Sequence, residues 1–385
     1  MAELNKIEHV VFKRTSEYLE VFLFVLKQFF RSSNVNKLYL RETLFLRING
    51  RKLYMRLSVL DQAPITKGNK SPQALQNAVE LAILADELGY HRMWMAEHHG
   101  TDAYASSAPE VTAAYLAAKT KRLRIGTGGV MMMHYSPLKL AEVFKTLSAL
   151  SPGRIDFGVG RAPGGDNFSM YALSEGRQPM LHNMYEKLDT ALRYINDELP
   201  VDELYQRTFA TPYQVELPEA WLLGSTGNSA RQAGEMGVGY SFAQFFNGDM
   251  SKELFDIYKN SFEPSAFMEK PQIMVSYMVT VADTVEEAEL QARPYDIARL
   301  MLQKGRITKI ITPEEAQNYP LSEIEEMTIQ EYRKKLHLVG TPKEIADQLL
   351  REKEHYGFDE AMIVSIPHSQ EKRLEVYRML AKELL

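Results

Sequence analysis

Two adjacent histidines preceded by an acid are the residues with the clearest potential for chemistry. They stand in Ala96-Glu97-His98-His99-Gly100, directly after an apolar run that is typical of a buried strand. A histidine in such a loop can act as a general acid or base, orient a ligand, or make a structural hydrogen bond. Metal binding is disfavoured, because adjacent side chains in an extended segment point to opposite sides. The residues alone leave the catalytic and the structural role open.

A second segment has the composition of a phosphate-binding loop. Gly224-Ser225-Thr226-Gly227-Asn228-Ser229 follows another apolar run and opens a helical pattern. Glycine and hydroxyl residues at a helix N-terminus offer backbone N–H groups, side-chain donors and the positive end of the helix dipole to an anion. Arg161 follows a different apolar run and would add a charge-assisted contact if it points inward. The alternative is an ordinary helix N-cap, which favours the same residue types.

Glycines interrupt a third segment, Gly126-Thr127-Gly128-Gly129, within a strand pattern. Glycine is unfavourable in a strand unless something approaches the backbone closely. A flat aromatic ring would need such a surface, and a bulge without a ligand is the alternative. Two other enzyme classes are disfavoured: no G-x-S-x-G elbow of a serine hydrolase occurs, and the G-x-G-x-x-G fingerprint is missing, because the segment from Gly158 to Pro163 lacks the third glycine.

The scaffold for these segments is predicted from Met55 onward, where short apolar runs alternate with helical patterns. The predicted strands are Arg56–Leu60, His91–Ala96, Leu123–Met131, Ile155–Gly160, Ala220–Gly224, Gly239–Ala243, Gln272–Val281 and Glu360–Ile366. The predicted helices are Pro72–Leu88, Pro109–Lys119, Pro137–Ala149, His182–Asn196, Asn228–Met236, Ser251–Asn260, Val285–Ala292, Pro342–Tyr356 and Ser369–Leu384. Eight strands alternating with helices predict an α/β fold of the (β/α)8 TIM barrel type, although a doubly wound sheet can also hold eight strands.

The segment Pro294–Val339 is too long for a simple connection and is predicted to be an insertion before the last strand. In a TIM barrel the active site lies at the C-terminal ends of the strands. The three candidate segments all follow or end predicted strands, so the barrel would bring them to one end.

Composition excludes several classes of protein. The chain has 385 residues, 45% of them hydrophobic, with a net charge of -5, so it has ample material for a core and no overall basic field for nucleic acid. It contains no cysteine, which excludes disulfides, thiolate metal sites and a cysteine nucleophile. The absence of cysteine fits a reducing compartment, and we expect a cytoplasmic protein.

Residues 1–54 differ from the rest, because they carry 10 Lys and Arg against 5 Glu, whereas the chain as a whole is acidic. Their apolar run Tyr18–Phe30 contains Glu20 and Lys27 and is shorter than the roughly 20 apolar residues that span a membrane. We expect an N-terminal extension outside the catalytic fold, with binding to a membrane surface or a partner as the alternative.

The segments taken together resemble the bacterial luciferase-like flavin monooxygenases, in particular the single-chain group similar to alkanal monooxygenase. The resemblance runs in order over residues 55–385 and rests on Leu57-Ser-Val-Leu-Asp61, Ala96-Glu-His-His99, Ala105-Ser-Ser-Ala-Pro-Glu110, Arg124-Ile-Gly-Thr-Gly-Gly-Val130, Ser151-Pro-Gly-Arg-Ile-Asp156, Gly158-Val-Gly-Arg-Ala-Pro-Gly164 and Gly224-Ser-Thr-Gly-Asn-Ser229.

This resemblance implies a TIM barrel that binds FMN at the C-terminal ends of its strands. By position, His98 matches the family's active-site histidine beside the reactive edge of the flavin, and Glu97 matches the neighbouring acid. Gly128 and Gly129 match a strand bulge under the isoalloxazine, which often contains a non-proline cis peptide. The remaining cofactor-binding residues that it implies are Ser107 and Ala108 beside the flavin, and Arg161, Thr226, Gly227, Asn228 and Ser229 around its phosphate.

The function implied is that of an FMN-dependent monooxygenase, which uses reduced flavin and dioxygen on a small apolar or carbonyl substrate. The expected partners are a separate flavin reductase and a second copy of the chain in a homodimer, with no metal, nucleic acid or membrane. Two alternatives keep the same barrel: a hydride-transfer enzyme that uses the deazaflavin F420, and a flavin-binding protein without turnover. A metal-dependent hydrolase is a distant further alternative.

Overall fold

The computed structural model describes residues 55–385 except residues 162–163 and 178–182. The predicted extension, residues 1–54, therefore lies outside the described residues. So do Ala162 and Pro163 of the segment that follows the fourth predicted strand, and His182 at the start of a predicted helix.

Eight parallel strands form a closed barrel, which confirms the predicted TIM barrel. Its order is β10-β1-β2-β3-β5-β6-β7-β8, and pairing of β10 with β8, for example of Glu360 with Met274, closes the ring. The barrel strands are β1 (Arg56–Asp61), β2 (Arg92–Met95), β3 (Arg124–Thr127), β5 (Ile155–Gly160), β6 (Glu219–Gly224), β7 (Gly239–Ala243), β8 (Ile273–Val281) and β10 (Glu360–Val364). The short β4 (Val130–Met131) continues the direction of β3 beyond Gly128 and Gly129 and pairs with β5.

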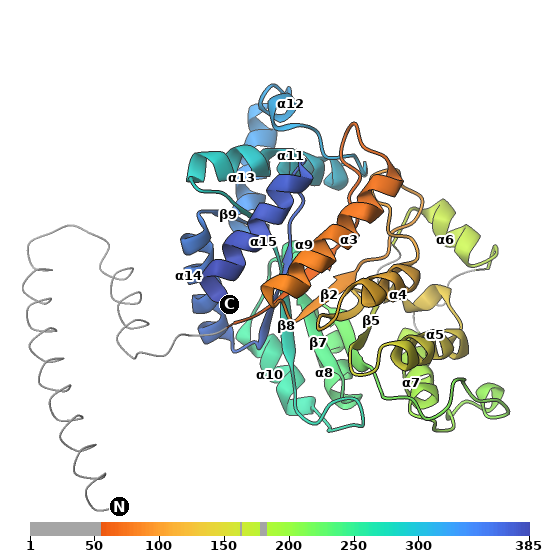
Figure 1. The fold of residues 1–385 in the computed structure, drawn as a ribbon. Helices are drawn as coiled ribbons and strands as arrows, with labels where there is room; N and C mark the ends of the chain where they lie inside the picture. Colours follow the sequence, from red (N-terminus) through yellow and green to blue (C-terminus); the bar gives the residue numbers. More distant parts are fainter. Residues whose placement is uncertain (1–54, 162–163, 178–182) are drawn as a thin grey trace, which may run out of the picture. The chain divides into compact units, whose positions relative to one another are not determined.

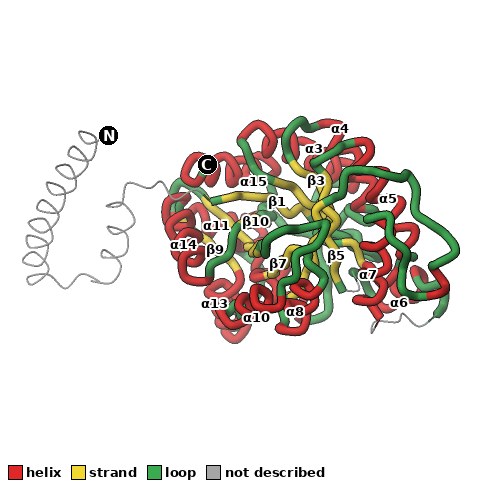
Figure 2. Tube along the Cα trace, turned by 90° about the horizontal axis from the view of Figure 1, so that it is seen from below, coloured by secondary structure: helices red, strands yellow, loops and turns green. Residues whose placement is uncertain are grey.

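Helices surround the strands, as Figure 2 shows in a view from below. They are α3 (Ser71–Leu88), α4 (Pro109–Lys119), α5 (Pro137–Leu150), α6 (Asn167–Leu173), α7 (Met184–Ile195), α8 (Gly227–Glu235), α9 (Gln244–Asn247), α10 (Lys252–Ser261), α11 (Val285–Gln303), α12 (Pro313–Gln317), α13 (Glu323–Leu336), α14 (Pro342–Tyr356) and α15 (Gln370–Leu384). None of the helices in the described part of the chain combines the length and the apolar composition needed to cross a membrane.

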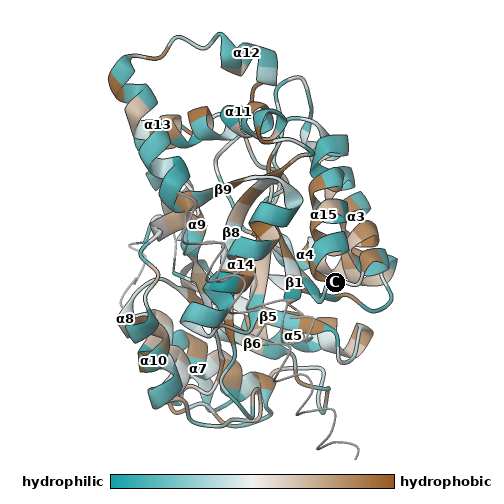
Figure 3. Ribbon diagram, turned by 90° about the vertical axis from the view of Figure 1, so that its left-hand side faces the viewer, coloured by the Kyte–Doolittle hydropathy of each residue, from teal (hydrophilic) through white to brown (hydrophobic). Residues whose placement is uncertain are grey.

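The predicted insertion differs in detail from the structure. Helix α11 does not end before Pro294 but continues through it to Gln303, because its buried face on both sides of the proline packs against neighbouring elements. The end of the same segment forms an unpredicted strand, β9 (His337–Gly340), which pairs in parallel with the C-terminal part of β8. Helices α11, α12 and α13 lie together at one end of the barrel in Figures 1 and 3.

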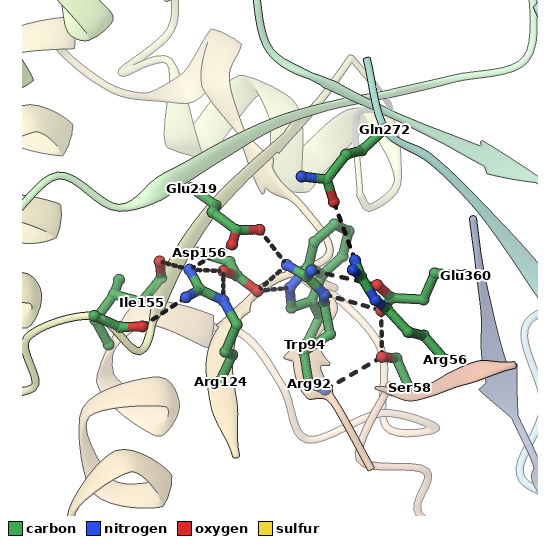
Figure 4. A network of polar contacts seen from close by, with 11 residues as sticks. Arg56, Ser58, Arg92, Trp94, Arg124, Ile155, Asp156, Glu219, Gln272 and Glu360 are labelled. Carbon is green, nitrogen blue, oxygen red and sulfur yellow. Dashed lines mark hydrogen bonds and ion pairs between the residues drawn. The ribbon is translucent and has the colours of Figure 1, made fainter. Parts of the chain in front are cut away.

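Along each strand, every second side chain points into the barrel. The N-terminal residues that face inward are polar, and Figure 4 shows their network. Arg92 is fully buried and forms ion pairs with Asp156 (2.8 Å), Glu219 (2.9 Å) and Glu360 (2.9 Å). Burial alone would raise the pKa of Asp156, but the guanidinium groups of Arg92 and Arg124 lower it. One arginine thus joins strands β2, β5, β6 and β10.

Above this polar layer the interior becomes apolar. Trp94 and Trp221 meet edge to face at 5.6 Å, and the Arg92 guanidinium lies 4.8 Å from the Trp221 ring centroid. Leu60 and Met362 belong to the same buried cluster. The outward faces of the strands pack against the surrounding helices in a larger core, and outer helices such as α14 turn mainly hydrophilic residues away from it (Figure 3).

We predict that Arg92→Met strongly destabilises the barrel, because three carboxylates would remain close together without their common cation. Removing one partner of a buried ion pair typically costs about 3–5 kcal/mol. Urea unfolding of the variant measures this loss.

Arg193→Met is the matched control, since Arg193 pairs with Asp189 on the partly exposed side of α7. An exposed pair of this kind contributes at most about 1 kcal/mol. Equal free energies of unfolding for the two variants would contradict the role assigned to Arg92.

Candidate active site

Glu97 lies buried at the C-terminal end of β2 and accepts three hydrogen bonds. His99 Nε2 lies 2.7 Å from Glu97 Oε1, the Tyr135 hydroxyl donates to the same oxygen at 2.6 Å, and the Met131 N–H donates to Oε2 at 2.9 Å. The carboxylate therefore connects the loop after β2 with the loop after β4. Burial, followed by the hydrogen bond and charge of Glu97, raises the pKa of Tyr135 well above its ordinary value.

His98 points elsewhere than His99, as expected for neighbours in an extended segment. Its N–H donates to the Ser106 carbonyl at 2.8 Å, and its ring stacks on Tyr104 with 4.4 Å between centroids. Its Nδ1 is buried and has no hydrogen-bond partner among the described residues. Burial, with a smaller effect of His99, lowers the pKa of His98 to about 4. The imidazole is therefore neutral at pH 7 and can accept a proton.

His99 and Tyr135 were not predicted as members of the site. Only the adjacency of His99 to His98 hinted at its place, and nothing in the local sequence indicates that Tyr135 reaches Glu97 across 38 residues. Glu110 lies near the same group, and its pKa is raised mainly by burial and further by the charge of Glu97. Within the described ranges no three metal-binding side chains come together.

Gly128 and Gly129 form the bulge between β3 and β4, and the peptide bond between them is cis. The close approach that requires glycine comes here from the protein itself. A Cβ on Gly128 would lie 2.7 Å from Leu60 Cδ1 and 3.0 Å from Trp94 Cβ. One on Gly129 would lie 2.9 Å from the Val159 carbonyl carbon. The bulge is therefore pressed against the interior of the barrel on one side.

The predicted phosphate loop is the N-terminus of α8 and forms a capping box. Thr226 Oγ1 accepts from the Ser229 N–H at 3.3 Å, and Ser229 Oγ accepts from the Thr226 N–H at 3.2 Å. The Ser229 hydroxyl is buried and also donates to the Thr226 carbonyl. The loop is therefore an N-cap, which was the alternative to a phosphate site, and its exposed side chains are Thr226 and Asn228, flanking Gly227. Phosphate binding at this loop stays a prediction.

The other predicted cofactor residues lie on neighbouring loops. Arg161 is exposed directly after β5, which pairs with β6, the strand that leads into α8. Ser107 is exposed, and Ala108 is the N-cap residue of α4 after β2. The loops after β2, β3, β5 and β6 carry all of the predicted site residues, and these four strands are consecutive in the barrel. The structure therefore gathers these residues along one arc of its C-terminal end.

Comparison with known proteins identifies the family. The model of the luciferase-like monooxygenase family matches residues 55–360. The chain belongs to this family. Members similar to it include YceB of Bacillus subtilis, 40% identical over 86% of this chain and all of that protein, and the N-acetyl-S-alkylcysteine monooxygenase of Bacillus subtilis, 36% identical over 86% and 98%. The solved structure of apo-MsnO8 has a TM-score of 0.78 and 33% identity, covering 87% of this chain and 98% of that one.

More distant solved structures share the fold. The oxygenating constituent of 3,6-diketocamphane monooxygenase from Pseudomonas putida, solved in complex with FMN, has a TM-score of 0.65 at 19% identity and covers 86% of this chain and 98% of that one. An F420-dependent secondary alcohol dehydrogenase has a TM-score of 0.61 at 16% identity and covers 86% of this chain and all of that one. The same barrel therefore occurs with either flavin or deazaflavin.

We predict that Gly128→Ala destabilises the fold by about 1–3 kcal/mol, because the added methyl group would collide with Leu60 and Trp94. Gly160→Ala at the end of β5 is the control, since a Cβ there meets only Leu223 Cβ at 4.0 Å. Thermal and urea unfolding compare the two. A Gly128→Ala variant as stable as Gly160→Ala would show that the bulge has more space than described.

Proposed function

We propose that the protein is an FMN-dependent monooxygenase that acts with reduced FMN and dioxygen on a small apolar or carbonyl substrate. Beyond the family itself, one observation supports this most: His98 presents a neutral imidazole with an unpartnered, buried Nδ1 at the barrel end where the other candidate residues gather. A buried polar atom of this kind is rare unless a ligand or reacting group uses it.

The residues present fit FMN. The N–H groups of Gly227 and Asn228 lie in the first turn of α8, where they have no intrahelical acceptor, and suit a phosphate together with Thr226 and the nearby Arg161. Ser229 positions this turn through the capping box rather than through its buried hydroxyl. The isoalloxazine would lie over the bulge at Gly128 and Gly129, with Ser107 and Ala108 at its side and Glu97 and His98 at its edge.

Reduced flavin, when bound, supplies the electrons that activate dioxygen. The chain's own part is to hold and shield the reactants. Glu97 is committed to three hydrogen bonds and holds His99, Tyr135 and the bulge in place. Neutral His98 accepts or returns a proton at Nδ1. The apolar side chains above the polar layer, such as Leu60 and Ile366, keep water from the reacting atoms and favour an apolar substrate.

The electrons are proposed to come from a separate flavin reductase and the active form to be a homodimer. The name of the diketocamphane relative, an oxygenating constituent, fits such a two-component system. The relative named for N-acetyl-S-alkylcysteine adds thioethers to the substrates worth testing.

The phosphate assignment predicts that Thr226→Ala weakens binding of FMN about tenfold and leaves binding of riboflavin unchanged, because only FMN carries the phosphate. Thr341→Ala is the control, because it removes the same kind of capping box from α14. Each of the two substitutions should therefore reduce the free energy of unfolding by about 1 kcal/mol. Fluorescence titration with both ligands measures the affinities. Equal FMN affinity in the two variants would contradict the assignment.

The role of His98 predicts that His98→Ala still binds FMN but loses product formation by about 100-fold or more, as for other general acid–base residues. Oxygen consumption and product are measured together with reduced FMN. His91→Ala, at the opposite end of the same strand segment, is the control.

The pH profile gives a second readout of His98. Its pKa is lowered to about 4, so the base is present above that value. We expect the acid limb of kcat/KM from this group near pH 4 rather than near the ordinary histidine value of about 6.5. Turnover by His98→Ala that matches the His91→Ala control would exclude it as the catalytic residue.

A further inference from the structure

Arg299 differs from three other partly buried or paired cations of the segment between β8 and β10. Arg293, Lys304 and Arg333 pair with Glu326, Glu325 and Asp296, respectively. Arg299 is partly buried, and no carboxylate of the described residues lies within ion-pair distance of it. Its Nε is buried without a hydrogen-bond partner in the part of the chain that the structure describes.

The contacts that Arg299 does make leave most of its hydrogen-bonding capacity unused. Nη2 donates to the Phe246 carbonyl at 3.1 Å, and the guanidinium carbon lies 5.7 Å from the exposed Phe246 ring. A guanidinium has five N–H donors in a planar fork that matches a carboxylate. Partial burial of such a cation without an anion is unfavourable.

The position of Arg299 relates it to the candidate active site. It lies one turn after Tyr295 on the same face of α11, and Tyr295 packs against the apolar interior of the barrel that includes Leu60. Tyr295 and Arg299 also line a small pocket between α11 and α13. Burial raises the pKa of Tyr104, which stacks on His98, and the charge of Arg299 opposes that rise. Arg299 therefore lies on the face of α11 from which Tyr295 packs against this apolar interior.

We propose that Arg299 binds a carboxylate of the substrate, so that the enzyme acts on apolar compounds bearing an acidic group. This inference rests on the proposed monooxygenase function. The phosphate of FMN is assigned to α8, which follows β6, whereas α11 follows β8. The carboxylate proposed to bind at Arg299 is therefore a different anion from the phosphate of FMN. The carboxylates in the tail of F420 are another source of the same chemistry, and the experiment separates the two sources.

The test measures binding by calorimetry to the full-length, FMN-loaded protein. The probes are 4-(methylsulfanyl)butanoate, an acidic thioether, and its uncharged methyl ester. Wild type should bind the acid more tightly than the ester. Arg299→Met should weaken binding of the acid about 10- to 100-fold, the usual effect of losing a hydrogen bond to a charged group, and leave the ester unchanged. Arg293→Met, two turns earlier on α11, should bind both like wild type.

Other outcomes would overturn the inference. If wild type does not prefer the acid, or if Arg299→Met weakens acid and ester equally, Arg299 only supports the fold. If the variant binds the acid normally but loses affinity for F420, the carboxylate belongs to a cofactor tail. Failure of the proposed function looks different: the protein would bind no FMN, while an Arg299-dependent preference for the acid in the flavin-free protein would still support the carboxylate site.

Discussion

The barrel depends on one guanidinium buried among three carboxylates. Arg92 reaches Asp156, Glu219 and Glu360 from β2, so a single cation holds the N-terminal ends of four strands in register. Ser58 of β1 also donates to Glu360 and so joins the same network. Each of these polar groups is satisfied by another, which makes a charged layer tolerable at this depth. The register of the strands in this polar layer determines where the C-terminal ends of the same strands lie, at the opposite end of the barrel.

The chemistry lies at those opposite ends. Glu97 follows Arg92 by five residues, Arg161 follows Asp156 by five, and Thr226 follows Glu219 by seven. An apolar layer with Trp94 and Trp221 separates the two regions. The barrel therefore has a buried charged network at its N-terminal end that stabilises it, and a separate group of polar residues at its C-terminal end that is proposed to act on flavin and substrate.

The sequence predicts much of this arrangement, because parallel strands that are buried on both faces appear as continuous apolar runs. It also predicts the loops that carry the candidate site, since active sites of barrels follow their strands. It does not predict that Glu97 joins Tyr135 and His99, because these contacts depend on how two loops cross in space. From the sequence, a flat ligand beside the backbone was one explanation for the glycine at position 128. In the structure, the side chains of Leu60 and Trp94 leave no space there for a larger residue. Helix α11 continues past Pro294, since packing of its buried face outweighs the loss of one backbone hydrogen bond.

A monooxygenase transfers one oxygen atom of dioxygen to its substrate, and isotopically labelled dioxygen shows whether this protein does so. The enzyme is supplied with chemically reduced FMN and a panel of ketones, aldehydes and thioethers, and the products are analysed by mass spectrometry. We expect one labelled oxygen atom in the product for each flavin oxidised. Products without label that form only with reduced F420, or oxidation of flavin without any product, would contradict it.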